Sequence, residues 1–274
     1  MNVLEGDRRV RMALNVIDRV VGGTYGRRRF QSMYRRVHNI ALIGLNYGYS
    51  DAALNGEHAF IDRLAREWNG RPVVALDVGA FHGTWSTAVL ERSPSASLHA
   101  FEPVASSFAQ LAANLDGLAH LHPCALGATS GTAQMFAPPS ADGSVGELAS
   151  LHDRDLSSFD LAVEPIGTVA VQTLDDFCAE QDITHIDLLK LDTEGHELSV
   201  LTGARRLLDS RAIDAIQFEF GGANIDSRVF LRDIIDVLRP THAVHRLLRD
   251  GVEPVRMDER EEIFTYANYV ALPA

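Results

Sequence analysis

The sequence predicts an α/β protein: a doubly wound, mostly parallel Rossmann-like sheet with an antiparallel final strand and an N-terminal helical segment. Beyond Pro72, short apolar runs of strand length alternate with stretches in which apolar residues recur every three or four positions. Such alternation is typical of a parallel sheet covered by helices on both faces. Two apolar runs near the C-terminus, 242–248 and 263–272, have no helical stretch between them. We therefore expect them to pair antiparallel at the sheet edge.

The region before the sheet reads mainly as helices. "ALNVIDRVV" and "HAFIDRLAREW" carry apolar residues at helical spacing on either side of the Gly- and Asn-rich loop 43–57. The chain is thus expected to divide into a helical segment, 1–70, that caps the site or forms a dimer contact, and a sheet domain, 71–274. The expected strands are 73–78, 97–103, 120–126, 186–192, 213–220, 242–248 and 263–272, and the expected helices run from about Thr84 and over 104–115, 196–208 and 227–238.

The stretch from about Ala137 to Pro165 interrupts this alternation. It is rich in Pro, Gly, Ser and Asp, and it is longer than an ordinary connection between two elements. We expect it either to form a lid or binding loop, in which His152 and Asp153 reach an acceptor, or to decorate the surface.

Composition and charge limit the function classes. With 274 residues, 46% of them hydrophobic, the chain can bury a substantial core. A net charge of -12 disfavours a nucleic-acid partner, because phosphates require a cationic surface. The arginines concentrated before residue 40 form either a solvated helix face or a contact with a partner subunit or an anionic surface, and a homodimer is expected. Two cysteines without metal-type spacing, no apolar run of about 20 residues and no secretory leader indicate a cytoplasmic protein without an integral membrane segment.

Candidate ligand-binding residues follow the first two expected strands of the sheet domain, where ligands bind in open parallel sheets. Gly79 permits a sharp turn, and Asp77 places a carboxylate where a cation can approach. A dinucleotide site would have glycine in place of Phe81, and Asp77 would repel a pyrophosphate, so a nicotinamide-dependent oxidoreductase is the weaker interpretation. Glu102 follows Gly79 by 23 residues (102 − 79), near the interval expected for a carboxylate that binds both ribose hydroxyls. The combination favours a cationic nucleoside, S-adenosylmethionine.

Seven motifs occur in order between about residues 73 and 220: "LDVGAFHG", "HAFEP", Asn114, "CALG", "TLDDF", "IDLLKLDTEGHELSVLTGA" and "FEF". In order and approximate spacing they resemble the FkbM family of S-adenosylmethionine-dependent methyltransferases, and "LLKLDTEGHELSVLTGA" is the most specific of them. The resemblance implies methyl transfer to a hydroxyl of a saccharide or glycosylated metabolite, as in sugar O-methyltransferases of actinobacteria. A polyketide or other secondary metabolite is the alternative acceptor. A non-catalytic S-adenosylmethionine-binding module is the alternative outside enzymes.

The resemblance also implies roles for individual residues. The expected cofactor contacts are Asp77, Gly79 and Ala80 beside the methionine portion, Glu102 at the ribose, Cys124 and Ala125 at the adenine, and Asp192 facing the sulfonium and the acceptor. "LNYGYS" and "NGE" resemble the approach segment of some members. In these segments, Asn46 and Glu57 are expected either to close over the methionine end or to lie in a solvated loop.

The remaining chemistry concerns the acceptor hydroxyl, which must be aligned with the methyl group and lose its proton. Asp192, His196 and Glu219 are the candidate bases. Asp192 and Glu219 could instead hold one Mg²⁺ that binds the acceptor oxygens and lowers the hydroxyl pKa. Lys190, the only lysine in the chain, points to the same side of its strand as Asp192. We expect Lys190 either to act on Asp192 or the acceptor hydroxyl, or to form a structural ion pair with a nearby acid.

Overall fold

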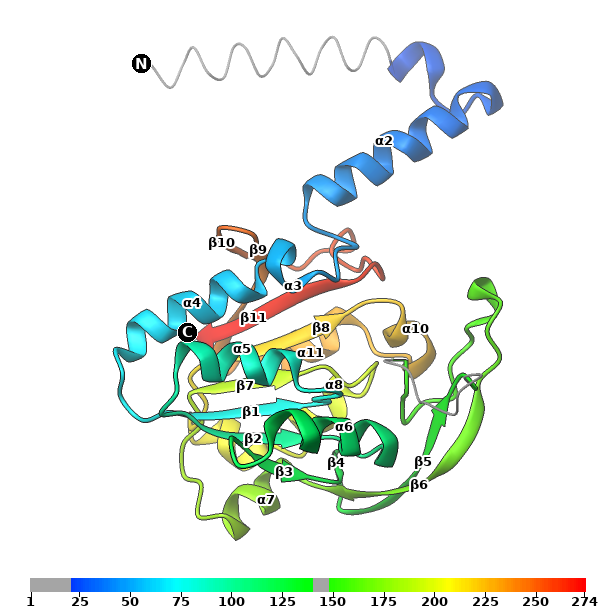
Figure 1. Cartoon of the computed structure of the whole chain (residues 1–274). Helices are drawn as coiled ribbons and strands as arrows, with labels where there is room; N and C mark the ends of the chain where they lie inside the picture. Colours follow the sequence, from blue (N-terminus) through cyan, green and yellow to red (C-terminus); the bar gives the residue numbers. More distant parts are fainter. Residues whose placement is uncertain (1–20, 140–147) are drawn as a thin grey trace, which may run out of the picture. The chain divides into compact units, whose positions relative to one another are not determined.

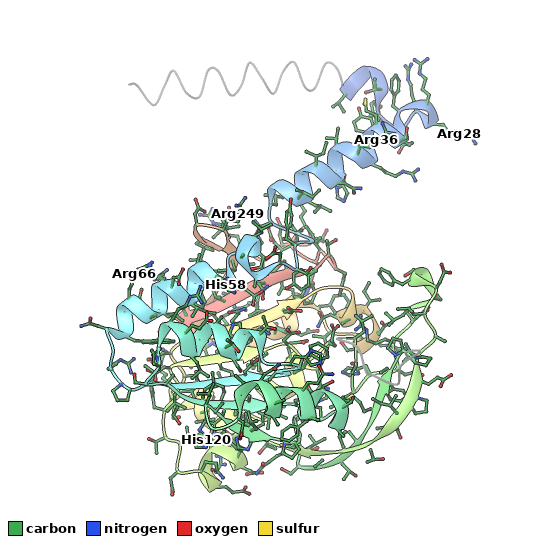
Figure 2. The ribbon with its side chains drawn as sticks, in the orientation of Figure 1. Arg28, Arg36, His58, Arg66, His120 and Arg249 are labelled. Carbon is green, nitrogen blue, oxygen red and sulfur yellow. The ribbon has the colours of Figure 1, made fainter. Side chains whose placement is uncertain are left out.

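The chain divides into two compact units, residues 1–45 and 46–274, and the computed structural model describes residues 21–139 and 148–274 (Figure 1). Most of the helical pattern expected at 13–21 lies outside the described residues. In the first unit, the short 3-10 helix Arg28–Phe30 leads into α2, Gln31–Gly44. These helices carry the basic side chains Arg28 and Arg36 (Figure 2). The expected capping or dimer contact of this region stays a prediction.

The second unit begins at Asn46 rather than near residue 70, because the helices after this point pack with the sheet. α3 (Ala52–Asn55) and α4 (Glu57–Trp68) belong to it. The apolar positions of α4 recur at helical spacing, and Phe60, Ile61, Leu64 and Trp68 are buried in the main core cluster. Within the described residues, none of the helices is both long and apolar enough to cross a bilayer.

The central sheet has the strand order β10-β9-β11-β8-β7-β1-β2-β3. The strands are β1 (Val74–Val78), β2 (Ser97–Phe101), β3 (His120–His122), β7 (Leu188–Leu191), β8 (Ile216–Phe220), β9 (His242–Leu248), β10 (Gly251–Pro254) and β11 (Ala267–Pro273). The five strands from β8 to β3 run parallel, and β11 pairs antiparallel with both β8 and β9. The predicted fold class is therefore confirmed, including the antiparallel pair near the C-terminus. The β9–β10 hairpin at the edge was not expected.

The helices that follow α4 are α5 (Thr84–Arg92), α6 (Ala105–Leu115), α7 (Leu174–Glu180), α8 (Glu197–Thr202), α9 (Arg205–Asp209), α10 (Ala223–Ser227) and α11 (Leu231–Leu238). Two of the predicted helices, 196–208 and 227–238, are shorter in the structure. The stretch 196–208 forms two helices separated by Gly203 and Ala204, and Gly203 packs so closely on another backbone that an added Cβ would lie 2.1 Å from the carbonyl oxygen of Gly127. The stretch 227–238 begins its helix only at Leu231, since the left-handed Arg228 ends α10.

A small second sheet with the order β4-β6-β5 stands beside the main one and corrects two expectations. The apolar run 120–126 is split by a turn at Pro123, so β4 (Ala125–Leu126) leaves the main sheet and pairs with β6 (Glu164–Gln172). β5 (Gly131–Ala137) pairs antiparallel with β6. These two strands are largely exposed, so their sequences lack the apolar runs that revealed the central strands. Residues 140–147 of the long stretch lie outside the described part.

The faces of the central strands place the polar residues that matter below. Ala75 of β1 and Leu188 of β7 pack in the same core cluster as α4, α5 and α6. Side chains alternate along a strand, so Asp77 and Lys190, two residues further on, lie on that same face. In the strand register Lys190 is paired with Asp77 on one side and with Gln217 of β8 on the other. On this face of each strand, the apolar residue lies in the core and the polar residue lies nearer the carboxyl end.

Candidate active site

A cavity of about 790 Å³ opens at the carboxyl ends of β1, β2, β7 and β8. This volume lies within the range of small-molecule sites. Its wall includes the loops that follow these strands, the start of α4, the segment 148–161 and the residues before β11. The wall is acidic. Its carboxylates are Glu57, Asp77, Glu102, Asp192, Glu194, Glu197 and Glu219, and its cations are Arg154 and Lys190.

The turn after β1 requires glycine at its first position. Gly79 has φ of +83°, and a Cβ added there would lie 1.8 Å from the carbonyl oxygen of Asp192. The backbone N–H groups of Gly79 and Ala80 donate to the Phe101 carbonyl oxygen at 3.0 and 2.9 Å. This geometry brings the ends of β1, β2 and β7 together around one point. Gly79 and Ala80 both line the cavity, as Asp192 does.

Glu102 is fixed at the end of β2 by two backbone donors. Its Oε2 accepts from Phe81 N at 3.0 Å, and its Oε1 accepts from Val104 N at 2.8 Å. Each oxygen keeps a further lone pair for a ligand hydroxyl. Burial raises the pKa of Glu102 to about 7, against the lowering effect of the two N–H donors. Glu102 and Asp77 both line this cavity, as expected for residues that end neighbouring parallel strands.

Asp77 is a buried carboxylate with one oxygen left over. Ser86 Oγ donates to its Oδ2 at 2.7 Å, whereas Oδ1 has no hydrogen-bond partner among the residues that the structure describes. Burial raises the pKa of Asp77 above its ordinary value, and the nearby Lys190 opposes that shift. A buried acceptor without a donor is costly, so this oxygen is suited to a ligand that brings a positive charge or a donor.

Lys190 pairs with Asp192, the carboxylate on which it was expected to act, and its part in the chemistry stays a prediction. The Nζ–Oδ2 distance is 2.7 Å, and only 6% of the lysine side chain is exposed. Burial by itself would lower the pKa of Lys190, but Asp192, Asp77, Glu57 and Glu219 together raise it above its ordinary value. The amine therefore stays protonated.

Glu219, near the end of β8, is held by a residue that the sequence analysis missed. Tyr266 donates its hydroxyl proton to Glu219 Oε1 at 2.8 Å, and Asn268 donates to the Tyr266 oxygen at 3.1 Å. Burial, with repulsion from Asp192, raises the pKa of Glu219 well above its ordinary value. Its role as a base stays a prediction. The antiparallel pairing of β11 with β8 brings Tyr266 here, and the sequence did not give that register.

His196 belongs to the cavity wall and contacts the segment 148–161. Its Nδ1 lies 3.2 Å from His152 Nε2, and burial lowers the pKa of His196 to about 4. The same segment is attached to the loop after β7 by Arg154, which pairs with Glu194 at 2.6 Å. Ser150 Oγ also donates to the Glu194 carbonyl oxygen at 2.8 Å. The described part of the predicted lid or binding loop therefore borders the cavity.

The remaining predicted contacts divide into two groups. Cys124 and Ala125 line the cavity, and Glu57 does too. Both oxygens of Glu57 accept side-chain amides, among them Gln217 at 2.8 Å, so its carboxylate is oriented by the fold. Asn46 does not reach the cavity wall: its amide donates to the carbonyl oxygens of residues 55 and 247 at 2.7 and 3.0 Å. Asn46 anchors backbone instead.

Two contacts oppose the Mg²⁺ site that was predicted at Asp192 and Glu219. One oxygen of Asp192 is bound by the ammonium of Lys190, and one oxygen of Glu219 is bound by the Tyr266 hydroxyl. Proteins usually bind Mg²⁺ through one or two carboxylates and several waters, so a fixed ammonium on one of the two carboxylates disfavours the ion.

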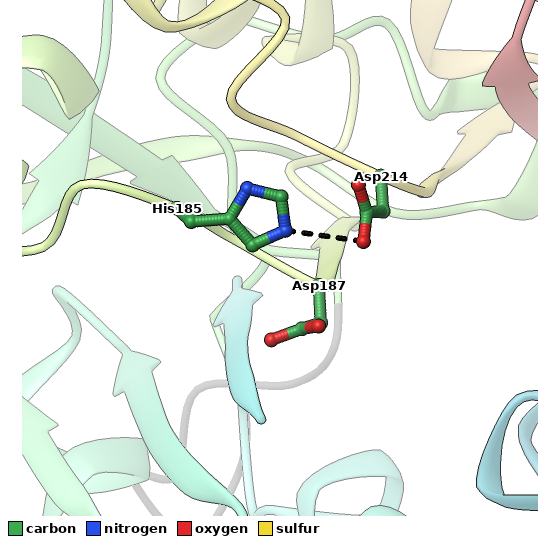
Figure 3. A group of neighbouring side chains, drawn as sticks. All are labelled: His185, Asp187 and Asp214. Atoms are coloured by element: carbon green, nitrogen blue, oxygen red, sulfur yellow. Dashed lines mark hydrogen bonds and ion pairs between the residues drawn. The ribbon is translucent and has the colours of Figure 1, made fainter. Parts of the chain in front are cut away.

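A separate group with metal-type donors lies at the opposite, amino ends of the strands (Figure 3). In it, His185 pairs with Asp214 at 3.1 Å. The third member, Asp187, is ion-paired with Arg71 at 2.5 Å and also accepts from Val74 N. Its carboxylate is thus occupied, and the group stabilises the strand starts.

The fold and the site together define a Rossmann-like methyltransferase that depends on S-adenosylmethionine. The Methyltransferase FkbM domain matches residues 77–247, and the chain belongs to this family. The 2-O-methyltransferase NoeI of Sinorhizobium fredii is 30% identical over 190 residues, which cover 66% of this chain and 76% of that protein.

Two solved methyltransferase structures are also similar to this chain. A TehB-like SAM-dependent methyltransferase from Corynebacterium glutamicum has 12% identity and a TM-score of 0.41, over 90% of this chain and 98% of that one. A precorrin-6y C5,15-methyltransferase from Geobacter metallireducens has 10% identity and a TM-score of 0.39, over 79% and 87%.

Proposed function

We propose that this chain transfers the methyl group of S-adenosylmethionine to a hydroxyl of a saccharide or glycosylated metabolite. The observation that carries the proposal is the meeting of Asp77, Glu102 and Asp192 in one acidic cavity at adjacent strand ends. A site of this charge suits a sulfonium nucleoside. The saccharide part is supported by the 30% identity to an enzyme named as a 2-O-methyltransferase. A polyketide hydroxyl is the second candidate acceptor, supported only by the resemblance of the motifs.

The cofactor is proposed to lie across the ends of β1 and β2. Glu102 accepts hydrogen bonds from both ribose hydroxyls, since each of its oxygens already holds one backbone N–H and has room for another donor. The unpaired Oδ1 of Asp77 receives the positively charged methionine end. Cys124 and Ala125 border the adenine. When bound, S-adenosylmethionine supplies an electrophilic methyl group and leaves as S-adenosylhomocysteine.

The acceptor hydroxyl must lose a proton as its oxygen bonds to the methyl carbon, and we assign this proton to Asp192. Asp192 follows β7, beside the turn at Gly79, and 28% of its side chain is exposed, so a hydroxyl can approach. Lys190 orients this carboxylate through its hydrogen bond to Oδ2. His196 is the second candidate base, because its lowered pKa leaves the imidazole neutral.

The experiment is incubation of the full chain with labelled S-adenosylmethionine and a panel of neutral glycosides and hydroxylated polyketides, followed by mass spectrometry of the products. We expect S-adenosylhomocysteine and a methyl ether on one hydroxyl of a glycoside. In the variant Asp192→Asn, turnover should fall by about 10²–10⁴-fold, the usual contribution of a general base, while S-adenosylhomocysteine still binds. Transfer to polyketides and to none of the glycosides would contradict the saccharide assignment. Cofactor binding without transfer to any hydroxyl would instead indicate a non-catalytic module.

A further inference from the structure

The position of Lys190 suggests why this acidic site has a single ammonium. Lys190 lies on β7 between Asp77 of β1 and Gln217 of β8, in the middle of the sheet. Its Nζ is 2.7 Å from Asp192 Oδ2. The strands on both sides fix the lysine stem, and the side chain is nearly inaccessible to solvent. The cation is therefore held in place by the fold and not by a flexible surface chain.

Four acidic groups lie close enough to raise the pKa of this lysine. They are Asp192 after β7, Asp77 on the neighbouring β1, Glu57 on α4 and Glu219 on β8. The other cation of the cavity wall, Arg154, is already paired with Glu194 at 2.6 Å. Carboxylates gathered in a buried site are costly unless a cation compensates them. In many proteins a divalent metal ion has that role.

We propose that the ammonium of Lys190 takes the place of a divalent metal ion in this site, so that methyl transfer proceeds without metal. This inference rests on the proposed function. A Mg²⁺ ion at about 2.1 Å from the carboxylate oxygens would come close to the fixed ammonium and be repelled by it. Both oxygens of Glu57 accept side-chain amides, and one oxygen of Glu219 accepts from Tyr266, so these groups have fewer oxygens to offer an ion.

A consequence for the acceptor follows from the difference between the two cations. A metal ion can bind two neighbouring acceptor oxygens at once and so select a diol. The Lys190 ammonium is engaged with Asp192 and contributes charge and orientation, but it does not chelate. Lys190 is thus a positioning residue that acts through Asp192. An acceptor needs only the hydroxyl that is methylated, and a glycoside lacking the neighbouring hydroxyl should still react.

The test exchanges the two cations. In Lys190→Met the stem is kept and the charge is lost, so the vacated carboxylates should bind Mn²⁺ at least tenfold more tightly than the chain with Lys190 intact does. Binding is measured by calorimetry and by electron paramagnetic resonance on the full chain. All proteins carry Asp214→Asn, which removes the separate group near His185. Adding Asp192→Asn to Lys190→Met should abolish the gain, and Lys190→Arg, which restores a cation, should not bind Mn²⁺.

The result that overturns the proposal is tight Mn²⁺ binding by the chain with Lys190 intact that is lost in Asp192→Asn, or methyl transfer that stops in excess chelator. Equal Mn²⁺ affinity with and without Lys190 would also overturn it. Circular dichroism and S-adenosylhomocysteine binding verify that Lys190→Met folds, and Lys190→Gln replaces it if it does not. Because Mn²⁺ binding needs no acceptor, this outcome is independent of whether a saccharide is the substrate.

Discussion

The exchange Glu102→Gln tests how the site recognises the cofactor. Glu102 Oε2 accepts from Phe81 N at 3.0 Å and Oε1 from Val104 N at 2.8 Å, so both carboxylate oxygens face a donor. Glutamine has one acceptor oxygen and an NH₂ group. One backbone N–H would therefore face another donor, and one ribose hydroxyl would lose its acceptor. The other ribose hydroxyl would keep a neutral acceptor in place of a charged one.

The magnitude follows from these lost contacts. A hydrogen bond to a charged group contributes about 1.5–3 kcal/mol, and a neutral one about 1 kcal/mol. Loss of one charged bond and weakening of the second amount to about 3 kcal/mol, which is roughly 100-fold in the dissociation constant. We expect this loss for S-adenosylhomocysteine and S-adenosylmethionine alike, because both have the same ribose.

The affinity should also depend on pH, with a sign set by Glu102. Burial raises its pKa to about 7, so the carboxyl of the free protein is protonated below that pH. Ribose hydroxyls donate best to the ionised form, so binding must displace the proton. Affinity should therefore rise toward pH 7 by up to about tenfold per pH unit and level off above it. In Glu102→Gln this dependence should disappear.

Isothermal titration with S-adenosylhomocysteine between pH 5.5 and 8.5 measures both effects. The control is Glu67→Gln on α4. Glu67 is exposed, pairs with Arg63 and does not line the cavity, so this change should leave the affinity unchanged. A dissociation constant for Glu102→Gln within threefold of the unmodified chain, with the same pH profile, would refute the assignment of Glu102 to the ribose.

Three other changes probe the site. Gly79→Ala should lower the free energy of unfolding by roughly 3 kcal/mol or more, whereas Gly70→Ala, also at positive φ but with nothing within 4 Å, should lower it by about 1 kcal/mol; equal losses in urea denaturation would disprove the role of close backbone approach. Asp77→Asn should weaken the binding of S-adenosylmethionine about tenfold more than that of S-adenosylhomocysteine, since only the former has a sulfonium. Equal losses of affinity for the two ligands in calorimetry would contradict the role of Asp77. Arg154→Gln should lower the free energy of unfolding by about 3 kcal/mol at pH 8 and by less at pH 6, because burial raises the pKa of Glu194 to about 7 and its unpaired carboxyl takes up a proton at lower pH. A loss of stability in thermal denaturation that does not depend on pH would contradict this prediction.

The sequence predicted the central sheet because its strands are buried on both faces. β1, β7 and β8 form nearly continuous apolar runs, so their positions and the strand-end residues Asp77, Glu102 and Asp192 could be located before the structure was known. β5 and β6 were not predicted, because they are mostly exposed and therefore lack a continuous apolar run. The split of 120–126 at Pro123 depends on pairing with β6, which a local pattern does not report.

The candidate site was predicted less completely, for a related reason. Residues placed by strand ends were found, because alternation along a strand fixes their direction. Tyr266 reaches Glu219 through the register of β11 against β8, and His152 reaches His196 from a loop 44 residues away. Neither contact leaves a local signal in the sequence. Asn46 was misplaced toward the cofactor because a polar loop residue gives no indication of which backbone carbonyl it will bind.

The central claim is that the acidic cavity above β1, β2 and β7 holds the sulfur nucleoside, and a crystal structure with S-adenosylhomocysteine tests it most directly. We predict both ribose hydroxyls within hydrogen-bond distance of Glu102 and the sulfur in the space between Asp77 and Asp192, with Lys190 still paired to Asp192. A ligand bound elsewhere, or a ribose that leaves Glu102 without contact, would contradict the account.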